Sequence, residues 1–218
     1  MASVLTVNAA AAPIALGELR TGIGKRPVDD ALPVRAPGPR RGGLGSGVVG
    51  DSVCNARYHG GDDQAVYAYA REDLDRWELE LGRQIGNGTF GENLTTTGVD
   101  VTECLIGERW AVGADGLVLE VTSPRTPCRT FTRWMDIAGW MKTFTAAVVP
   151  GAYFRVLEPG SVRAGDAIEV IARPDHTVTI GMVFRAMMLD PGLMPALAVA
   201  DALPEKIMRK VAKHVAVS

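Results

Sequence analysis

The sequence predicts a mainly β protein of the α+β class, with a small helical region toward its C-terminal end. Short runs rich in β-branched and aromatic residues recur before Pro174, and turns rich in Gly and Pro separate them. Helical patterns are few there, so strands and helices do not alternate regularly. Three helical segments in succession follow Pro174. These observations favour a closed or partly closed β architecture over a doubly wound sheet.

The first elements are a strand and a glycine-spaced segment. The strand is expected at residues 4–8, and the segment 20–28 follows after an alanine-rich connection. Glycines in 20–28 let backbone amides approach an anion closely, and Lys25 adds a positive charge. The same residues are also typical of a turn with a solvated basic pair. Because the complete phosphate-loop pattern is missing, both interpretations stay open.

A long loop dense in Pro and Gly, residues 33–50, leads toward His59. His59 stands directly before two glycines and a strand-like run at 65–69. A histidine on a tight glycine loop can reach a ligand or transfer a proton, although a single histidine is more often structural. A helix is expected at 71–82, where acids crowd the first turn and Gly82 suits the C-terminal cap.

Residues 86–94 form a second glycine-rich segment, which ends in an acid and an amide. Asn93 offers both a donor and an acceptor to a heterocycle or phosphate, and Glu92 can fix a neighbouring amide. Turn chemistry explains the same residues equally well. Beyond this segment, strands at 110–112 and 117–121 are predicted to form a hairpin.

The second strand of that hairpin leads into Ser123-Pro124-Arg125-Thr126-Pro127-Cys128-Arg129. Two prolines predict a rigid, non-helical loop. Arg125 and Arg129 place positive charge near the Cys128 sulfur, which favours the thiolate, the form that acts as nucleophile or metal ligand. The alternative is a small buried hydrophobe, the commonest role of a free cysteine.

Two more strands are expected at 153–157 and 166–171, joined by the turn 158–161. They follow a mixed region whose aromatic side chains are expected to pack against the core.

Three helices are expected in the C-terminal part, at 180–189, from Asp190-Pro191 onward, and from Pro204 onward. In the last one, apolar side chains share one face and basic side chains cover the remainder. The apolar residues are Ile207, Val211 and Val215, and the basic ones are Lys206, Arg209, Lys210 and Lys213. A basic helix suits an acidic redox partner, although a solvated face explains it more simply.

Composition narrows the functional classes. The chain has 218 residues, 47% of them hydrophobic and 22% charged, which is ordinary for a globular protein. A net charge of −2 does not favour a nucleic-acid surface, and no apolar run is long enough to span a bilayer. No basic residue precedes the first apolar run, so a secretory signal is not expected. We therefore expect a cytoplasmic location. The oligomeric state, monomer or homodimer, stays open.

The cysteines agree with a reducing compartment. Cys54, Cys104 and Cys128 are an odd number without paired zinc-site spacing, which argues against a disulfide framework and a structural zinc site.

Six short motifs follow one another along nearly the whole chain. They are Thr21-Gly22-Ile23-Gly24-Lys25-Arg26-Pro27-Val28, His59-Gly60-Gly61, Ala65-Val66-Tyr67-Ala68-Tyr69, Phe90-Gly91-Glu92-Asn93-Leu94, Pro124-Arg125-Thr126-Pro127-Cys128 and Gly151-Ala152-Tyr153. As an ordered set they resemble the MOSC family, named for the C-terminal domain of molybdenum cofactor sulfurases, and most of all its YiiM-like branch. The resemblance implies a MOSC β-barrel-like domain at 1–173 and a C-terminal three-helix domain at 174–218.

The resemblance also implies a bound molybdenum cofactor, a molybdenum-pterin, with Cys128 as the cysteine ligand of the metal. A soft thiolate is a sensible ligand for such a metal. Three cations are then expected to neutralise the cofactor phosphate: Lys25, Arg125 and Arg129. His59, Glu92 and Asn93 are expected to line the pocket, and Arg57 is a further expected cofactor-binding residue.

YiiM-like proteins are associated with reducing N-hydroxylated compounds, including hydroxylaminopurines, to amines or amidines. The resemblance therefore implies an oxidoreductase, independent of pyridoxal phosphate, with a small N-hydroxylated substrate and a separate electron-donor redox protein. Cys128 and His59 are the expected catalytic residues, His59 in a proton-transfer role. The alternatives are a cofactor or sulfur carrier without turnover, and a metal-free thiol enzyme or peroxide sensor.

The chain departs from the family pattern in one loop. Relatives often have a proline and a lysine where this chain has Asp62-Asp63-Gln64. A missing cation changes the charge of the pocket and with it the preferred substrate. Cys54 and Cys104 match no motif of the family and are expected to be packing residues.

Overall fold

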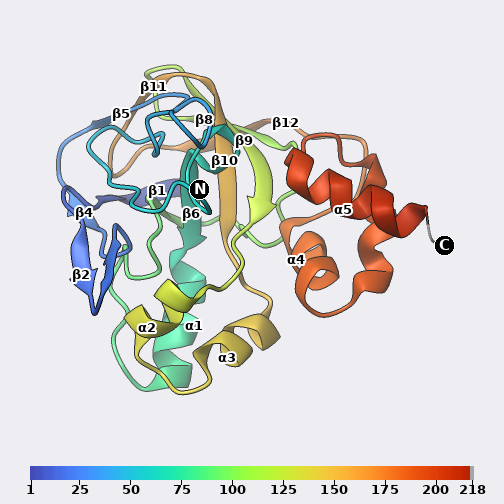
Figure 1. Cartoon of the computed structure of the whole chain (residues 1–218). Coiled ribbons are helices and arrows are strands. Elements are labelled where there is room, and N and C mark those ends of the chain that lie inside the picture. Colours follow the sequence, from blue (N-terminus) through green and yellow to red (C-terminus); the bar gives the residue numbers. More distant parts are fainter. Residues whose placement is uncertain (217–218) are drawn as a thin grey trace.

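A curled, mixed β-sheet of eight strands forms the centre of the protein (Figure 1). The computed structural model describes residues 1–216. The strands of this sheet are β1 (Ser3–Ala9), β4 (Arg26–Val28), β6 (Val66–Ala70), β7 (Leu94–Thr97), β8 (Arg109–Val112), β9 (Leu117–Pro124), β10 (Ala152–Glu158) and β12 (Ile168–Ala172). Their order across the sheet is β12-β8-β9-β10-β6-β7-β1-β4.

The two ends of the sheet approach each other, so the sheet is barrel-like and partly closed. Ser3 at the start of β1 forms an antiparallel bridge with Ala167, directly before β12. Three backbone hydrogen bonds support the bridge, from Val4 to the carbonyl of Asp166 at 2.8 Å, from Gly165 to that of Val4 at 2.8 Å and from Ile168 to that of Ala2 at 3.0 Å. Within residues 1–216 no continuous ladder joins β1 to β12, so closure is incomplete. The predicted partly closed β architecture is confirmed.

Two short pairs of strands flank the main sheet: β2 (Ile14–Leu16) with β3 (Leu19–Thr21), and β5 (Leu32–Val34) with β11 (Gly160–Val162). The second pair corrects one prediction, because 158–161 is not a simple turn between two neighbouring strands. β10 pairs with β6 and β9, whereas β12 pairs with β8. The β11 strand stands between β10 and β12 in the chain and pairs with β5 instead.

The strands β6 and β7 form a parallel pair, connected through α1 (Arg71–Leu81). A parallel pair needs such a crossover, because a short turn reverses the chain. Leu74 and Trp77 bury the apolar face of α1, as the helical spacing predicts. Gly82 ends the helix at φ 61°, in the left-handed region that glycine adopts without a steric penalty.

Two short helices follow β9 and close one end of the sheet, α2 (Arg129–Met135) and α3 (Trp140–Ala147) (Figure 1). They pack with α1 around a cluster of buried aromatic rings. Phe90 and Phe131 lie at its centre, with ring centroids 5.1 Å apart in an edge-to-face arrangement. This packing places the loop that precedes α2 next to the end of β6.

The C-terminal part consists of α4 (Ile180–Met188), the 3-10 helix η2 (Pro191–Val199) and α5 (Glu205–Val215). The three predicted helical segments are confirmed, although the middle one is a 3-10 helix. Ile207 and Val211 are buried, but Val215 is 50% exposed, so the apolar face of α5 ends one turn earlier than predicted. Figure 1 shows these helices beside the sheet, at the side opposite β2. The division at 173/174 stays a prediction.

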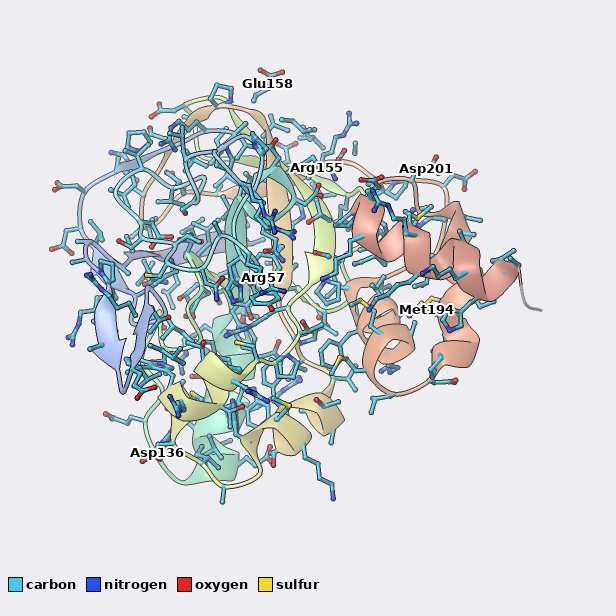
Figure 2. All side chains as sticks on the ribbon, in the orientation of Figure 1. Arg57, Asp136, Arg155, Glu158, Met194 and Asp201 are labelled. Atoms are coloured by element: carbon cyan, nitrogen blue, oxygen red, sulfur yellow. The ribbon has the colours of Figure 1, made fainter. Side chains whose placement is uncertain are left out.

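One arginine ties the C-terminal part to the sheet. Arg155 on β10 donates to the carbonyl of Ala202 at 3.2 Å and pairs with Asp63 at 2.5 Å and Glu120 at 2.7 Å. Figure 2 shows Arg155 on the side of the sheet that faces the C-terminal helices. Asp63 belongs to the 3-10 turn η1 (Asp62–Gln64), so this network holds the turn in place. Within residues 1–216, none of the helices has the length and apolar character needed to cross a bilayer.

Candidate functional site

A cavity of about 140 Å³ lies where β6 and β10 meet the loops that precede β4, β6, β7 and α2. Its wall combines segments that are far apart in the sequence: 19–25, 46–60, 90–93 and 125–130. Deep in the cavity, the Tyr67 and Tyr153 rings lie 4.9 Å apart. The six motifs of the sequence converge on this one place.

Cys128 lines the cavity at the end of the proline-bounded loop. It is the N-cap of α2, and its Sγ accepts a hydrogen bond from the backbone N–H of Phe131 at 3.5 Å. Burial on its own would raise the pKa of the thiol. A hydrogen bond from His59, the charge of Arg125 and the Phe131 N–H outweigh burial and lower this pKa to about 6. Cys128 is therefore largely thiolate at neutral pH. Of the two arginines expected to act on its sulfur, Arg125 does so and Arg129 is not among the causes.

Arg125 is the cation that acts on this sulfur. It is only 7% exposed, and its guanidinium carbon lies 3.7 Å from the centre of the Phe131 ring and 5.4 Å from that of Tyr67. Its Nη1 donates to the carbonyl of Phe90. These contacts hold the guanidinium in one position, which suits a cation that must stabilise a fixed negative charge.

His59 lines the cavity, and its interaction with the Cys128 thiol is one of the causes that lower the pKa of that thiol. The two glycines after it explain how the chain turns there. Gly60 and Gly61 have φ of 80° and 82°, and a Cβ on Gly60 would lie 2.7 Å from the carbonyl oxygen of Gly45. Only glycine fits such a close backbone approach.

Lys25 lines the cavity but is already paired with a carboxylate. Its Nζ contacts both oxygens of Asp51, and the two side chains are 8% and 1% exposed. Burial lowers the pKa of Lys25, and the Asp51 charge offsets only part of this effect. Asp51 also accepts from Ser46 Oγ at 2.8 Å and from the backbone N–H of Ala10 at 3.0 Å. The positive charge of Lys25 is thus neutralised within the protein.

Asn93 and Glu92 form hydrogen bonds mainly with other groups of the protein. Asn93 lines the cavity, where its Nδ2 donates to Asp51 Oδ2 at 2.9 Å and its Oδ1 accepts from the Tyr67 N–H at 3.2 Å. Glu92 is fully buried behind the cavity wall and accepts from the Gly88 N–H at 2.5 Å. Burial raises the pKa of Glu92. Its placement makes Glu92 a support of the 86–93 turn, and the expectation that it lines the pocket is wrong.

Two predicted cofactor-binding residues lie away from the cavity wall. Arg57, labelled in Figure 2, is exposed. Its guanidinium carbon lies over the Tyr58 ring, 5.3 Å from the ring centre. Arg129 is exposed at the first position of α2. Neither residue belongs to the cavity lining. The family resemblance implied both, but neighbouring residues on a loop or a helix point in different directions, so a place beside His59 or Cys128 in the chain does not put a side chain in the cavity.

The cavity wall also contains residues that were not predicted from the sequence, and three of them bear on its chemistry. Cys54, expected to be a packing residue, is exposed and lines the cavity, whereas Cys104 is buried as expected. Arg20 and Gln64 also line it. The Gln64 Oε1 is buried and makes no hydrogen bond with any residue in 1–216. Arg20 lies within the glycine-spaced anion-binding candidate, so a signal for it was present.

The fold and the cavity define a class of protein: a partly closed β domain that presents one activated thiol to a cavity. The chain matches the MOSC domain over residues 55–169. It is 31% identical to the uncharacterized protein YflK of Bacillus subtilis over 163 residues, which cover 75% of this chain and 69% of YflK. The chain belongs to the MOSC domain family.

Two other relatives match over smaller shares. Protein YiiM of Escherichia coli is 30% identical over 58% of this chain and 57% of its own length. A protein of Gibberella moniliformis named "Reductase" is 31% identical over 59% of this chain, which spans only 23% of that much longer protein.

Solved structures share the fold. The crystal structure of YiiM from Geobacillus stearothermophilus superposes with a TM-score of 0.78 at 22% identity, over 99% of this chain and 100% of that one. YiiM from Escherichia coli gives a TM-score of 0.73 at 22% identity, over 100% and 94% of the two chains. The MOSC domain is of the molybdenum-cofactor-sulfurase type, so the family is associated with that cofactor.

Proposed function

We propose that this protein is a molybdenum-cofactor-dependent reductase that converts N-hydroxylated compounds, such as hydroxylaminopurines, to amines. One observation carries the proposal. The Cys128 thiol, with its pKa lowered to about 6, lines a cavity in a chain of the MOSC family. A thiolate available at neutral pH is what a soft metal requires of a cysteine ligand.

The donor set of the cavity fits a molybdenum-pterin. Cys128 offers the thiolate, and the unpartnered Gln64 Oε1 offers an acceptor for a ring N–H, since a buried acceptor without a partner is costly. When bound, the cofactor would supply the two-electron redox centre. Cys128 would hold the metal, and Lys25 and Asn93, both fixed by Asp51, would shape the far wall.

The remaining chemistry falls to residues of the chain. Reduction of R–NHOH to R–NH₂ takes up two electrons and two protons and releases water. His59 lines the cavity beside Cys128 and can hold and release a proton at its imidazole. The Tyr67 hydroxyl donates to the carbonyl of Pro150 at 2.7 Å, and burial raises its pKa, so Tyr67 stays neutral and shapes the wall. The electrons would come from a separate redox protein.

The test combines metal content with turnover. Protein made in a host that synthesises the cofactor is expected to contain molybdenum, and Cys128→Ser is expected to lose it. Cys104→Ser is the control, because Cys104 is buried away from the cavity. Wild-type protein is then expected to reduce 6-hydroxylaminopurine with a chemical electron donor. Full molybdenum retention by Cys128→Ser would refute the ligand assignment.

The alternative is a carrier of the cofactor or of sulfur, without turnover. The second thiol in the cavity wall, Cys54, favours this alternative, because two thiols in one cavity can exchange sulfane sulfur. A carrier would retain molybdenum or a persulfide on Cys128 and leave 6-hydroxylaminopurine unchanged. The turnover assay therefore separates the two functions.

A further inference from the structure

The cations that line the cavity differ in how the rest of the protein engages them. Lys25 is paired with Asp51, and these two side chains cancel. Arg125 is buried, with its guanidinium over the Phe131 ring and its Nη1 donating to the carbonyl of Phe90, so it is held within the protein. The remaining cation of the wall is Arg20. Within residues 1–216, Arg20 makes no ion pair with a carboxylate.

Arg20 stands at the outer part of the cavity. It belongs to β3, opposite Ala15 of β2, and is exposed. Its neighbour Leu19, also in the wall, is 40% exposed. The charge of Arg20 acts on the Cys54 thiol, which is itself exposed. These residues form a rim that solvent reaches, in contrast to the buried Lys25 and Arg125.

The rim is held against the rest of the site by a close backbone contact. A Cβ on Gly22 would lie 1.9 Å from the carbonyl oxygen of Ser52, so only glycine lets these two segments touch. Thr21 closes the local turn, because its Oγ1 accepts from the Ile23 N–H at 3.1 Å. Arg20 is therefore presented by a defined backbone and not by a free loop.

We infer that Arg20 binds a phosphate monoester carried by the ligand of this cavity. A guanidinium offers a planar fork of donors that matches phosphate oxygens, and an exposed cation without an ion pair at the rim of a cavity attracts an anionic group. This inference rests on the proposed function for the identity of the ligand. Two sources share the chemistry: the phosphate of a nucleotide substrate, and the phosphate of the pterin cofactor. An exposed position at the rim suits a group that enters and leaves with the substrate.

The experiment uses full-length protein from a cofactor-producing host and compares Arg20→Gln, Arg20→Lys and Arg26→Gln. Arg26 is the matched control, because it is exposed on the next strand and does not line the cavity. Adenosine 5′-monophosphate and adenosine are titrated calorimetrically into each protein. Molybdenum and pterin contents are measured on the same preparations.

If Arg20 binds a substrate phosphate, Arg20→Gln should weaken binding of the monophosphate about tenfold and leave the affinity for adenosine unchanged. Arg20→Lys should recover part of the affinity for the monophosphate. Added salt should then weaken monophosphate binding to the wild type more than to Arg20→Gln. If Arg20 binds the cofactor phosphate instead, Arg20→Gln should contain less molybdenum and pterin than Arg26→Gln. The affinity for the monophosphate should then equal that for adenosine.

Equal behaviour of Arg20→Gln and Arg26→Gln in both measurements would overturn the inference. Calorimetric binding needs no turnover, so an intact Arg20 effect with no reduction of N-hydroxylated compounds would refute the proposed function alone.

Discussion

Cys54 and Cys128 line the same cavity, yet their thiol pKa values are shifted in opposite directions. Burial raises the pKa of Cys54, and the charges of Arg20 and Lys25 offset only part of the effect. At Cys128 the hydrogen bond from His59 and the charge of Arg125 outweigh burial. The two cysteines therefore differ in their anionic fraction at neutral pH, and this difference can be measured.

The first prediction concerns alkylation of cofactor-free protein by iodoacetamide. The rate at Cys128 should rise with pH to a plateau, with a midpoint near 6, because the thiolate is the reacting form. Cys54 should still gain reactivity at alkaline pH. Peptide mass spectrometry after timed quenching measures each site. In His59→Asn the Cys128 midpoint should move upward, and an unchanged midpoint would contradict the role given to His59.

The second prediction concerns the buried ion pair between Lys25 and Asp51. Asp51→Asn should lower the free energy of unfolding by about 3–5 kcal/mol, because it leaves a buried ammonium without its counter-charge. Urea unfolding followed by tryptophan fluorescence measures the change. Arg209→Gln is the control, since the Arg209–Glu205 pair is 70% and 78% exposed and should contribute less than about 1 kcal/mol. Similar losses in both variants would argue against the pairing.

The third prediction concerns pH and Asp73 on α1. Burial raises the pKa of Asp73 from 3.8 to about 6, and the Arg76 charge lowers it only in part. A raised carboxyl pKa contributes stability below the unfolded value, and this contribution is lost as pH rises through about 6. The free energy of unfolding of Asp73→Asn, relative to that of the wild type, should therefore rise by about 1–2 kcal/mol from pH 4 to pH 7. Thermal unfolding at both pH values checks this.

Asp75→Asn on the same helix is the control for that measurement, because the Asp75 side chain is 60% exposed. If Asp75→Asn and Asp73→Asn show the same pH dependence, burial of Asp73 is not its cause.

The fourth prediction concerns the contact between Gly22 and Ser52. Gly22→Ala should lower the free energy of unfolding by about 1–3 kcal/mol, because the added Cβ overlaps the Ser52 carbonyl and must displace the cavity wall. Gly86→Ala should change it far less, since the nearest atom to its Cβ is Thr89 Oγ1 at 3.8 Å. Urea unfolding of the two variants compares them, and equal losses would show that the close contact does not exist.

Local patterns predicted much of the fold. The β8–β9 hairpin, the helix α1 with Gly82 at its end and the start of α5 after Pro204 all depend on short-range rules of period, turn and cap. Such rules act within a few residues and need no knowledge of the rest of the chain. The strand β11 and its pairing with β5 were not predicted. Its partner lies more than a hundred residues earlier in the chain, and no local signal specifies that pairing.

The same division runs through the site. The sequence by itself determined that Cys128 stands on a proline-bounded cationic loop and that His59 precedes two glycines, since both features are properties of adjacent residues. Only the tertiary structure decided that Asp51 neutralises Lys25, that Cys54 and Arg20 line the cavity, and that Arg57 and Arg129 lie outside it. The physical reason is that charge balance and burial depend on which distant segments the chain brings together, and adjacency in sequence does not report this.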